Sequence, residues 1–123
     1  MSAEIKFCGL TRAEDADVAV SLGASYVGVI FAGGPRSLTV RQAIDVLAAT
    51  PVAVRRVGVF ADQPPEEIAR TAEQLELTVV QLHGASSPER IAAVRRSFLG
   101  QIWSVCRVSG TPLPVGVADV MAA

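Results

Sequence analysis

The sequence predicts an α/β fold in which parallel strands alternate with helices, and residues 1–123 are expected to form one domain. Short apolar runs rich in β-branched residues recur along the chain, and each is followed by turn or helix-capping residues. Between these runs, apolar residues recur at the spacing of one helix face. The runs are apolar on both faces, which is typical of strands buried within an α/β protein.

The first part of the chain contains two strand and helix pairs. Residues 5–8 and 26–31 are the apolar runs that predict the first two strands. Thr11 and Glu14 have the spacing of a capping box, which satisfies free N–H groups at a helix start, and Thr39 with Gln42 repeats it. The residues expected on the buried helix faces are Ala16, Ala19, Val20 and Leu22, then Val40, Ala43, Ile44 and Leu47.

The pattern continues through the rest of the chain. Further strands are predicted at residues 54–60, 77–82 and 102–106. Pro64 and Pro65 predict the start of a third helix, because proline is favoured in a first turn. Residues 86–89 begin a fourth helix, and residues 115–123 are expected to begin a fifth. The buried faces of the third and fourth helices are expected to carry Ile68, Ala72 and Leu75, then Ile91, Val94 and Phe98.

Two architectures fit this order: an open doubly wound sheet of the flavodoxin type, or part of a (β/α)8 TIM-type barrel. Lys6 and Cys8 are two residues apart, so both face one side of the first strand. Gln81 and His83 are related in the same way at the end of the fourth strand. A barrel turns such strand-end side chains toward a shared mouth. We therefore predict an incomplete barrel with about five strands and four to five helices.

The composition argues against several classes of protein. The net charge is −1 and only 5% of residues are aromatic, so the basic surface of a nucleic-acid-binding protein is missing. No apolar run approaches the roughly 20 residues of a membrane helix. The N-terminus does not resemble a signal peptide, so the expected location is cytoplasmic. Cys8 and Cys106 lie far apart without a Cys/His cluster, so we expect free thiols and no zinc site.

Cys8 is the first candidate for chemistry. A cysteine in an apolar run is most often a small buried hydrophobic residue. Cys8, however, ends a predicted strand, where α/β folds place their sites, and Gly9 allows close approach of backbone or ligand. Lys6 faces the same way, and a nearby ammonium favours the thiolate. A thiolate here could act as a nucleophile or as a general base.

Other polar residues near predicted strand ends have both a structural and a functional interpretation. His83, the single histidine, is either a satisfied structural residue or a hydrogen-bond donor to an anionic substrate group. Arg36 follows a glycine-rich loop and is either solvated or a clamp for a carboxylate or phosphate. Gln81 carries no specific signal alone. Arg55 and Arg56 lie at the opposite end of their strand and are expected to be structural or solvated.

Four segments together resemble phosphoribosylanthranilate isomerase, an enzyme family of tryptophan biosynthesis. They are "KFCGLTRAEDA" at residues 6–16, "GASYVGVIFAGGPRSLT" at 23–39, "RVGVFADQPPEEI" at 56–68 and "VVQLHG" at 79–84. Each segment alone is a weak signal. Their colinear order, in register with the predicted strands and helices from residue 4 to about 108, makes the resemblance specific.

The resemblance implies a (β/α)8 barrel and an Amadori rearrangement of N-(5-phosphoribosyl)anthranilate by general acid-base catalysis, without cofactor or metal. Cys8 falls on the family's general base, which takes the proton from C2 of the ribose-derived moiety. Arg36 falls on the arginine that contacts substrate near the anthranilate. Gln81 and His83 fall on the segment that lines the mouth and binds substrate. Lys6 and Gly9 are expected to support this site, and the partner is a small phosphorylated substrate.

The resemblance covers only the N-terminal five-eighths of a barrel, which typically takes about 200 residues or more. The family's general acid is an aspartate at the end of strand six, and its phosphate-binding loops follow strands seven and eight. Five strands leave two open sheet edges, which favour self-association. We therefore expect the isolated chain to be inactive and prone to self-associate through these edges.

Two other classes of function remain open from the sequence. The first is a non-catalytic α/β module that binds a small molecule or a partner, which the short chain favours and the intact Cys8, Arg36 and "QLHG" set disfavours. The second is a thiol redox enzyme that uses Cys8, which lacks a resolving cysteine nearby in the sequence. Activity toward a related aminoaldose substrate of histidine biosynthesis also remains open.

Overall fold

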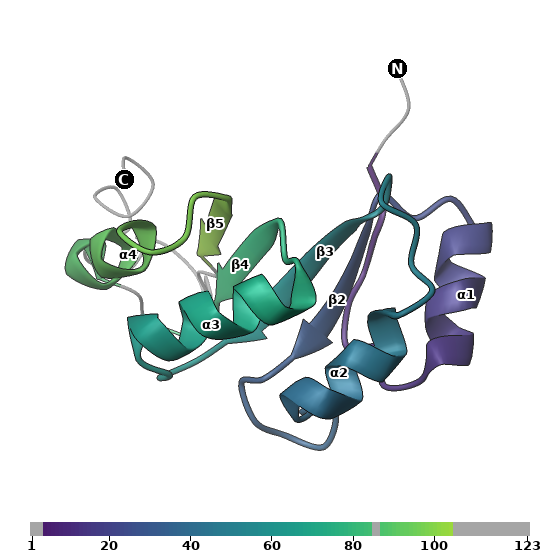
Figure 1. Ribbon diagram of the computed structural model, residues 1–123, viewed down its shortest axis with the longest axis horizontal. Coiled ribbons are helices and arrows are strands. Elements are labelled where there is room, and N and C mark those ends of the chain that lie inside the picture. Colours follow the sequence, from purple (N-terminus) through teal and green to yellow (C-terminus); the bar gives the residue numbers. More distant parts are fainter. Residues whose placement is uncertain (1–3, 85–86, 105–123) are drawn as a thin grey trace, which may run out of the picture.

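The computed structural model describes residues 4–84 and 87–104 of the chain. These residues form a five-stranded sheet in the order β1-β2-β3-β4-β5, and every neighbouring pair is parallel (Figure 1). The strands are β1 (Lys6–Phe7), β2 (Tyr26–Ile30), β3 (Arg55–Phe60), β4 (Val79–Leu82) and β5 (Gln101–Ser104). The helices are α1 (Ala13–Ser21), α2 (Val40–Leu47), α3 (Pro65–Leu75) and α4 (Pro88–Arg95).

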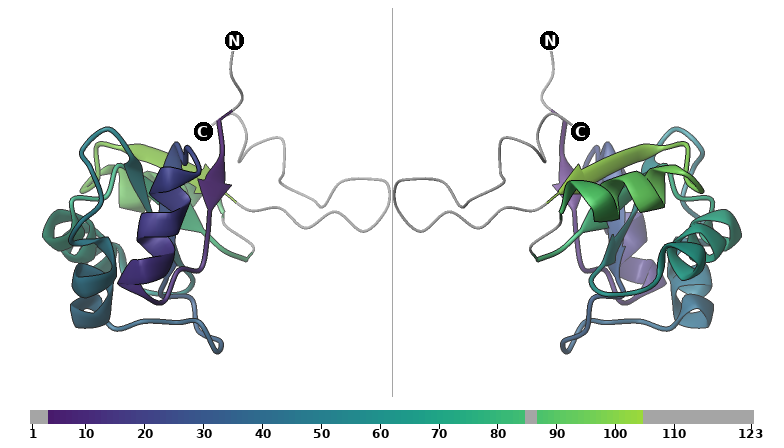
Figure 2. Two further views of the ribbon diagram at one scale, coloured as in Figure 1. Left: turned by 90° about the vertical axis from the view of Figure 1, so that its right-hand side faces the viewer. Right: turned by 90° about the vertical axis from the view of Figure 1, so that its left-hand side faces the viewer.

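All four helices pack against the same side of the sheet (Figures 1 and 2). Each helix contacts the next one along the chain, α1 with α2, α2 with α3 and α3 with α4. A doubly wound sheet would reverse its strand order at a switch point and carry helices on both faces. Sequential parallel strands with helices outside are the arrangement of a (β/α) barrel wall. The prediction of a partial barrel is therefore confirmed over the described residues.

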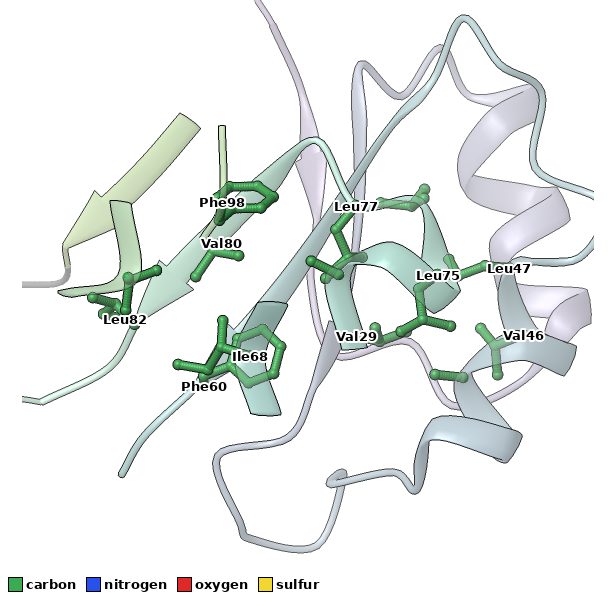
Figure 3. Packing of buried hydrophobic residues seen from close by; sticks show 14 of the residues in the cluster. Val29, Val46, Leu47, Phe60, Ile68, Leu75, Leu77, Val80, Leu82 and Phe98 are labelled. Atoms are coloured by element: carbon green, nitrogen blue, oxygen red, sulfur yellow. The ribbon is translucent and has the colours of Figure 1, made fainter. Parts of the chain in front are cut away.

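The main hydrophobic core lies between the sheet and the helices (Figure 3). Alternate strand residues such as Val29, Phe60 and Val80 point into it, and each is at most 1% exposed. From the helix side, Ile68 and Leu75 of α3 are equally buried. Burial of such side chains contributes roughly 1.5–3 kcal/mol each, which fixes the helices against the sheet.

The opposite face of the sheet, which we call the inner face, carries a separate hydrophobic cluster. This cluster consists of Tyr26, Val57 and Val79 with the half-buried Trp103, and it includes no helix residue. The rings of Tyr26 and Trp103 meet edge to face, with centroids 5.0 Å apart. In a barrel this face is turned toward the barrel axis. A site is therefore expected on this face at the C-terminal ends of the strands.

The two predicted capping boxes have different outcomes. Thr39 and Gln42 form the expected reciprocal pair, with N–H to oxygen distances of 2.8 and 3.1 Å. The box at Thr11 is wrong, because α1 begins one residue later and its N-cap residue, Arg12, makes no side-chain cap. Arg12 instead donates to Asp15 at 3.1 Å, and this hydrogen bond lowers the pKa of the Asp15 carboxyl.

The predicted buried faces are mostly confirmed, but Leu22, expected on the buried face of the first helix, lies just beyond α1 and is 62% exposed. Those of α3 and α4 are buried as expected, including Phe98 just beyond α4. Ser87 caps α4 by accepting from the N–H of Arg90 at 3.1 Å. In α2 the side chain of Val46 is buried, whereas Ile44 is 45% exposed, so the buried face is rotated from the predicted one. The predicted fifth helix and Cys106 lie outside the described residues.

Arg55 and Arg56 have the structural role expected of them. Arg56 donates to the carbonyl oxygens of Leu75 at 2.9 Å and of Leu47 at 3.0 Å, which lie at the C-terminal ends of α3 and α2. Arg55 donates to the hydroxyl of Tyr26 at 2.7 Å. Both arginines therefore stabilise the N-terminal end of the sheet, away from the predicted site.

Candidate functional site

Cys8 directly follows β1, at the edge of the sheet formed by the C-terminal ends of the parallel strands. It is a free cysteine and is exposed. Lys6 lies on the same face, as predicted: a Cβ placed on Gly28 would stand 3.5 Å from Lys6 Cε and 3.6 Å from Cys8 Sγ. Gly28, which has no side chain, therefore leaves space next to both groups. The thiol lies on the inner face of the sheet.

The guanidinium of Arg36 lies against the backbone of Gly9, the residue after Cys8. The φ angle of Gly9 is 74°, which side-chain-bearing residues rarely adopt. A Cβ on Gly9 would also stand 2.7 Å from Arg36 Cζ, so the guanidinium occupies the space that a side chain would fill. Gly9 is buried although its neighbour Cys8 is exposed. Two independent constraints thus require glycine beside the candidate base.

The loop that carries Arg36, residues 31–38, is fixed at both ends. Where the loop begins, Phe31 N–H donates to Val59 at 2.7 Å. Where it returns, Leu38 N–H donates to Ile30 at 2.8 Å, and Ile30 pairs with Ser37 as an isolated bridge. Arg36 is the residue just before this bridge, so the loop places its side chain over the C-terminal end of β1.

Lys6 spans the inner face rather than pointing into solvent. Its ammonium donates a hydrogen bond to the side-chain oxygen of Gln81 on β4 and lies 5.5 Å from the ring centroid of Trp103 on β5. This single side chain therefore connects β1 with the strands at the far side of the sheet. Gln81, predicted to bind substrate, has its amide oxygen engaged by Lys6.

His83 follows β4 at the same edge of the sheet as Cys8. Its backbone N–H donates to Phe60 at 2.8 Å, and its side chain is exposed. Within residues 4–84 and 87–104 no side-chain hydrogen bond joins the imidazole to Cys8 or Arg36. The structure thus places Lys6 and Cys8 at Gly28 and Arg36 at Gly9, while His83 follows β4 at the same edge of the sheet.

The sequence reasoning missed two polar residues at this rim. Gln63, in the loop after β3, and Arg90, on α4, bond backbone groups next to the Arg36 loop. Gln63 could have been found by applying to strand three the argument used for the strand-end residues of strands one and four. Arg90 has no such signal, because only the fold brings α4 against the loop after β3.

Groups that could hold a metal ion are not found among the described residues, where no cluster of three or more His, Cys, Asp or Glu side chains occurs. In the same part of the chain, no helix combines the length and apolarity needed to cross a membrane.

Comparison with known proteins accounts for this arrangement. A family model described as N-(5'-phosphoribosyl)anthranilate (PRA) isomerase matches residues 5–106. The chain belongs to this family. The resemblance seen in the sequence motifs is therefore confirmed, and the match includes all five strands of the isomerase-like sheet.

Relatives in the PRA isomerase family align with most of this chain but extend beyond it. The PRA isomerase of Rubrobacter xylanophilus is 46% identical over 101 residues, which are 81% of this chain and 49% of that protein. The tryptophan biosynthesis protein TrpCF of Haemophilus influenzae is 43% identical over 109 residues, 86% of this chain and 22% of that protein. The chain thus spans about half the length of the PRA isomerases it matches.

Solved PRA isomerase structures share the fold. The enzyme from Thermus thermophilus superimposes with a TM-score of 0.80 at 40% identity, covering 89% of this chain and 55% of that one. A PRA isomerase in complex with reduced 1-(o-carboxyphenylamino)-1-deoxyribulose 5-phosphate gives 0.82 at 32% identity, covering 89% and 56%. The five strands and four helices therefore correspond to one side of the PRA isomerase barrel.

Proposed function

We propose that this chain contributes the general base and the carboxylate-binding residue of an N-(5'-phosphoribosyl)anthranilate isomerase. The observation that carries the proposal is the contact of the Arg36 guanidinium with Gly9, the residue that follows Cys8. A base and a cation at one strand end suit a substrate that loses a proton and also carries a carboxylate, which the cation would bind. The PRA isomerase solved with reduced 1-(o-carboxyphenylamino)-1-deoxyribulose 5-phosphate holds a ligand with such a carboxylate.

In the proposed reaction Cys8, as a thiolate, takes the proton from C2 of the ribose-derived moiety after the sugar ring opens. Ring opening leaves a protonated imine between C1 and the anthranilate nitrogen. The electrons of the C2–H bond form the double bond between C2 and C1, while the electrons of the C1–N double bond return to nitrogen. Protonation at C1 and loss of the proton from the C2 hydroxyl then leave a ketone at C2 and the nitrogen on a saturated carbon. Ring opening requires a general acid, which the family resemblance gives as an aspartate after strand six, beyond the described strands.

Arg36 is proposed to bind the anthranilate carboxylate, because a guanidinium pairs with a carboxylate through two parallel hydrogen bonds. Gln81 and His83 are proposed to donate hydrogen bonds to substrate from the opposite rim. Lys6 supports the site by holding the oxygen of Gln81. A free thiol as base needs a reducing compartment, in agreement with the cytoplasmic location expected from the sequence.

A chimera tests this proposal. Residues 4–104 of this chain replace the matching half of the Rubrobacter xylanophilus enzyme, and turnover of PRA is measured. We expect turnover comparable to the parent, and Cys8→Ala should reduce kcat about 10²-fold or more, the usual contribution of a general base. Gln74→Ala, on the exposed side of α3, is the matched control. An active Cys8→Ala chimera, or a folded chimera without turnover, contradicts the proposal.

A second candidate function is a binding module without turnover, because Arg36 lies at Gly9 and Lys6 at Gly28, so that two cations lie near the C-terminal end of β1. Such a module would use Arg36 and Lys6 to hold an anionic aromatic ligand. It is distinguished by the same chimera, since a module that has lost catalysis would bind the reduced analogue but would not turn over substrate even when the other half of the barrel is supplied.

A further inference from the structure

A relay of hydrogen bonds runs along the rim from α4 to the start of the Arg36 loop. Its centre is Gln63, in the loop between β3 and α3. The side-chain amide of Gln63 donates to the carbonyl oxygen of Phe31 at 2.6 Å, and its oxygen accepts from the N–H of Ala61 at 2.7 Å. One amide side chain thereby ties the C-terminal end of β2 to the loop that follows β3.

Arg90 fixes Gln63 from the other side. Its guanidinium donates to the carbonyl oxygen of Gln63 at 3.1 Å and to that of Ala61. Arg90 lies in the first turn of α4, which is anchored by the Ser87 cap and by the buried Ile91. The loop after β3 is therefore held in place by its hydrogen bonds to a packed helix.

Phe31 is the last fixed residue before the segment that carries Arg36. Its ring stacks on Phe60 with a centroid distance of 5.2 Å, and its carbonyl accepts from Gln63. Between Phe31 and Ser37 the chain contains Gly33 and Gly34, both at positive φ, and is bonded only within itself over the described residues. Such a flexible segment takes its position from its two ends.

We propose that Gln63, held by Arg90, is a positioning residue that places the Arg36 guanidinium over Gly9 beside Cys8. It acts through the backbone of Phe31 and does not touch the substrate. The proposal rests on the proposed function in that Arg36 binds the substrate carboxylate. Loss of the relay should therefore weaken substrate binding while proton transfer to Cys8 continues.

The kinetic test uses three variants in the chimera described above. Gln63→Ala removes both side-chain bonds, whereas Gln63→Glu removes the donor to Phe31 and keeps an acceptor for Ala61. Arg90→Met removes the support of the loop. Each should raise KM about fivefold to tenfold, the effect of one lost hydrogen bond, and leave kcat within about twofold. Gln74→Ala on α3 and Arg96→Met just after α4 change exposed side chains and should alter neither constant.

A second readout does not depend on activity. Trypsin cleaves after Arg36, in the loop that the relay positions, and the cleavage rate at each site is followed by mass spectrometry. In Gln63→Ala and Gln63→Glu, cleavage after Arg36 should accelerate about fivefold, while cleavage after Arg70 and Arg95 keeps the rate of the unmodified protein. Equal acceleration at all sites would mean general destabilisation and would overturn the proposal.

The two readouts separate the possible failures. If the unmodified chimera has no turnover but Gln63 variants release the Arg36 loop, the proposed function fails and the positioning role stands. If KM and the Arg36 cleavage rate both stay unchanged in Gln63→Glu, the positioning role is wrong while the proposed function stands. A fall in kcat without a change in KM would also overturn it, because Gln63 would then act on the chemical step.

Discussion

At the scale of single residues, Gly9 is the residue on which the site geometry depends most. Its positive φ lets the chain turn sharply after β1, and its missing side chain lets Arg36 lie against the backbone. These effects are separable, because Gly23 has a similar φ of 89° with no atom within 4 Å of its Cβ position. The two glycines therefore form a matched pair.

Substitution of this pair distinguishes backbone strain from the contact with Arg36. Gly9→Ala and Gly23→Ala should each destabilise the chimera by about 1 kcal/mol, the cost of a side chain at positive φ. Only Gly9→Ala should raise KM, by about tenfold or more, since it displaces the guanidinium. Thermal unfolding and steady-state kinetics measure the two effects. Equal kinetics for both variants would show that Arg36 does not need this contact.

Much of the site could be predicted from residue spacing alone. Lys6 and Cys8 share a face because side chains alternate along a strand, and the structure places both over Gly28. The contact between Arg36 and Gly9 could not be predicted, because it depends on how a loop with two positive-φ glycines folds back onto β2. The engagement of Gln81 by Lys6 likewise requires the curvature of the whole sheet.

At the scale of helices and strands, sequence patterns located every described element but not every boundary. The strands β1 to β4 are shorter than predicted. For example, β1 includes only Lys6–Phe7, because pairing with β2 stops there. The two capping-box patterns show the limit of spacing rules. Thr11 and Glu14 match the pattern, yet α1 starts at Ala13 and the Arg12 side chain bonds Asp15 instead. Local competition between side chains decided the outcome.

These two threonines give a direct test at this scale. Thr39→Ala removes a side chain that accepts from Gln42 N–H, and should destabilise the chimera by about 1 kcal/mol. Thr11→Ala should change the free energy of unfolding by less than about 0.5 kcal/mol, because Thr11 caps nothing. Urea unfolding of both variants measures the difference. An equal loss in both would mean that Thr11 contributes to the start of α1 after all.

At the scale of the whole molecule, the described residues form an open sheet whose outer strands each pair on one side only. β1 pairs with β2 and β5 pairs with β4, and Figure 2 shows these two outer strands. The inner face between them carries Tyr26, Trp103 and Lys6. Unpaired strand edges and a partly apolar inner face favour association with other strands. Since the chain spans about half of its relatives, we propose that catalysis requires the other half of the barrel.

Complementation between two polypeptides tests this claim most directly. The 123-residue chain is mixed with a polypeptide that carries the unmatched C-terminal half of the Rubrobacter xylanophilus enzyme, and PRA turnover is measured for each alone and for the mixture. The two halves of the Rubrobacter enzyme itself, mixed in the same way, provide the positive control. We expect no turnover from either polypeptide alone and measurable turnover from the mixture, abolished by Cys8→Ala. Turnover by the 123-residue chain alone at the rate of a complete enzyme would contradict the account, as would an inactive mixture when the control pair is active.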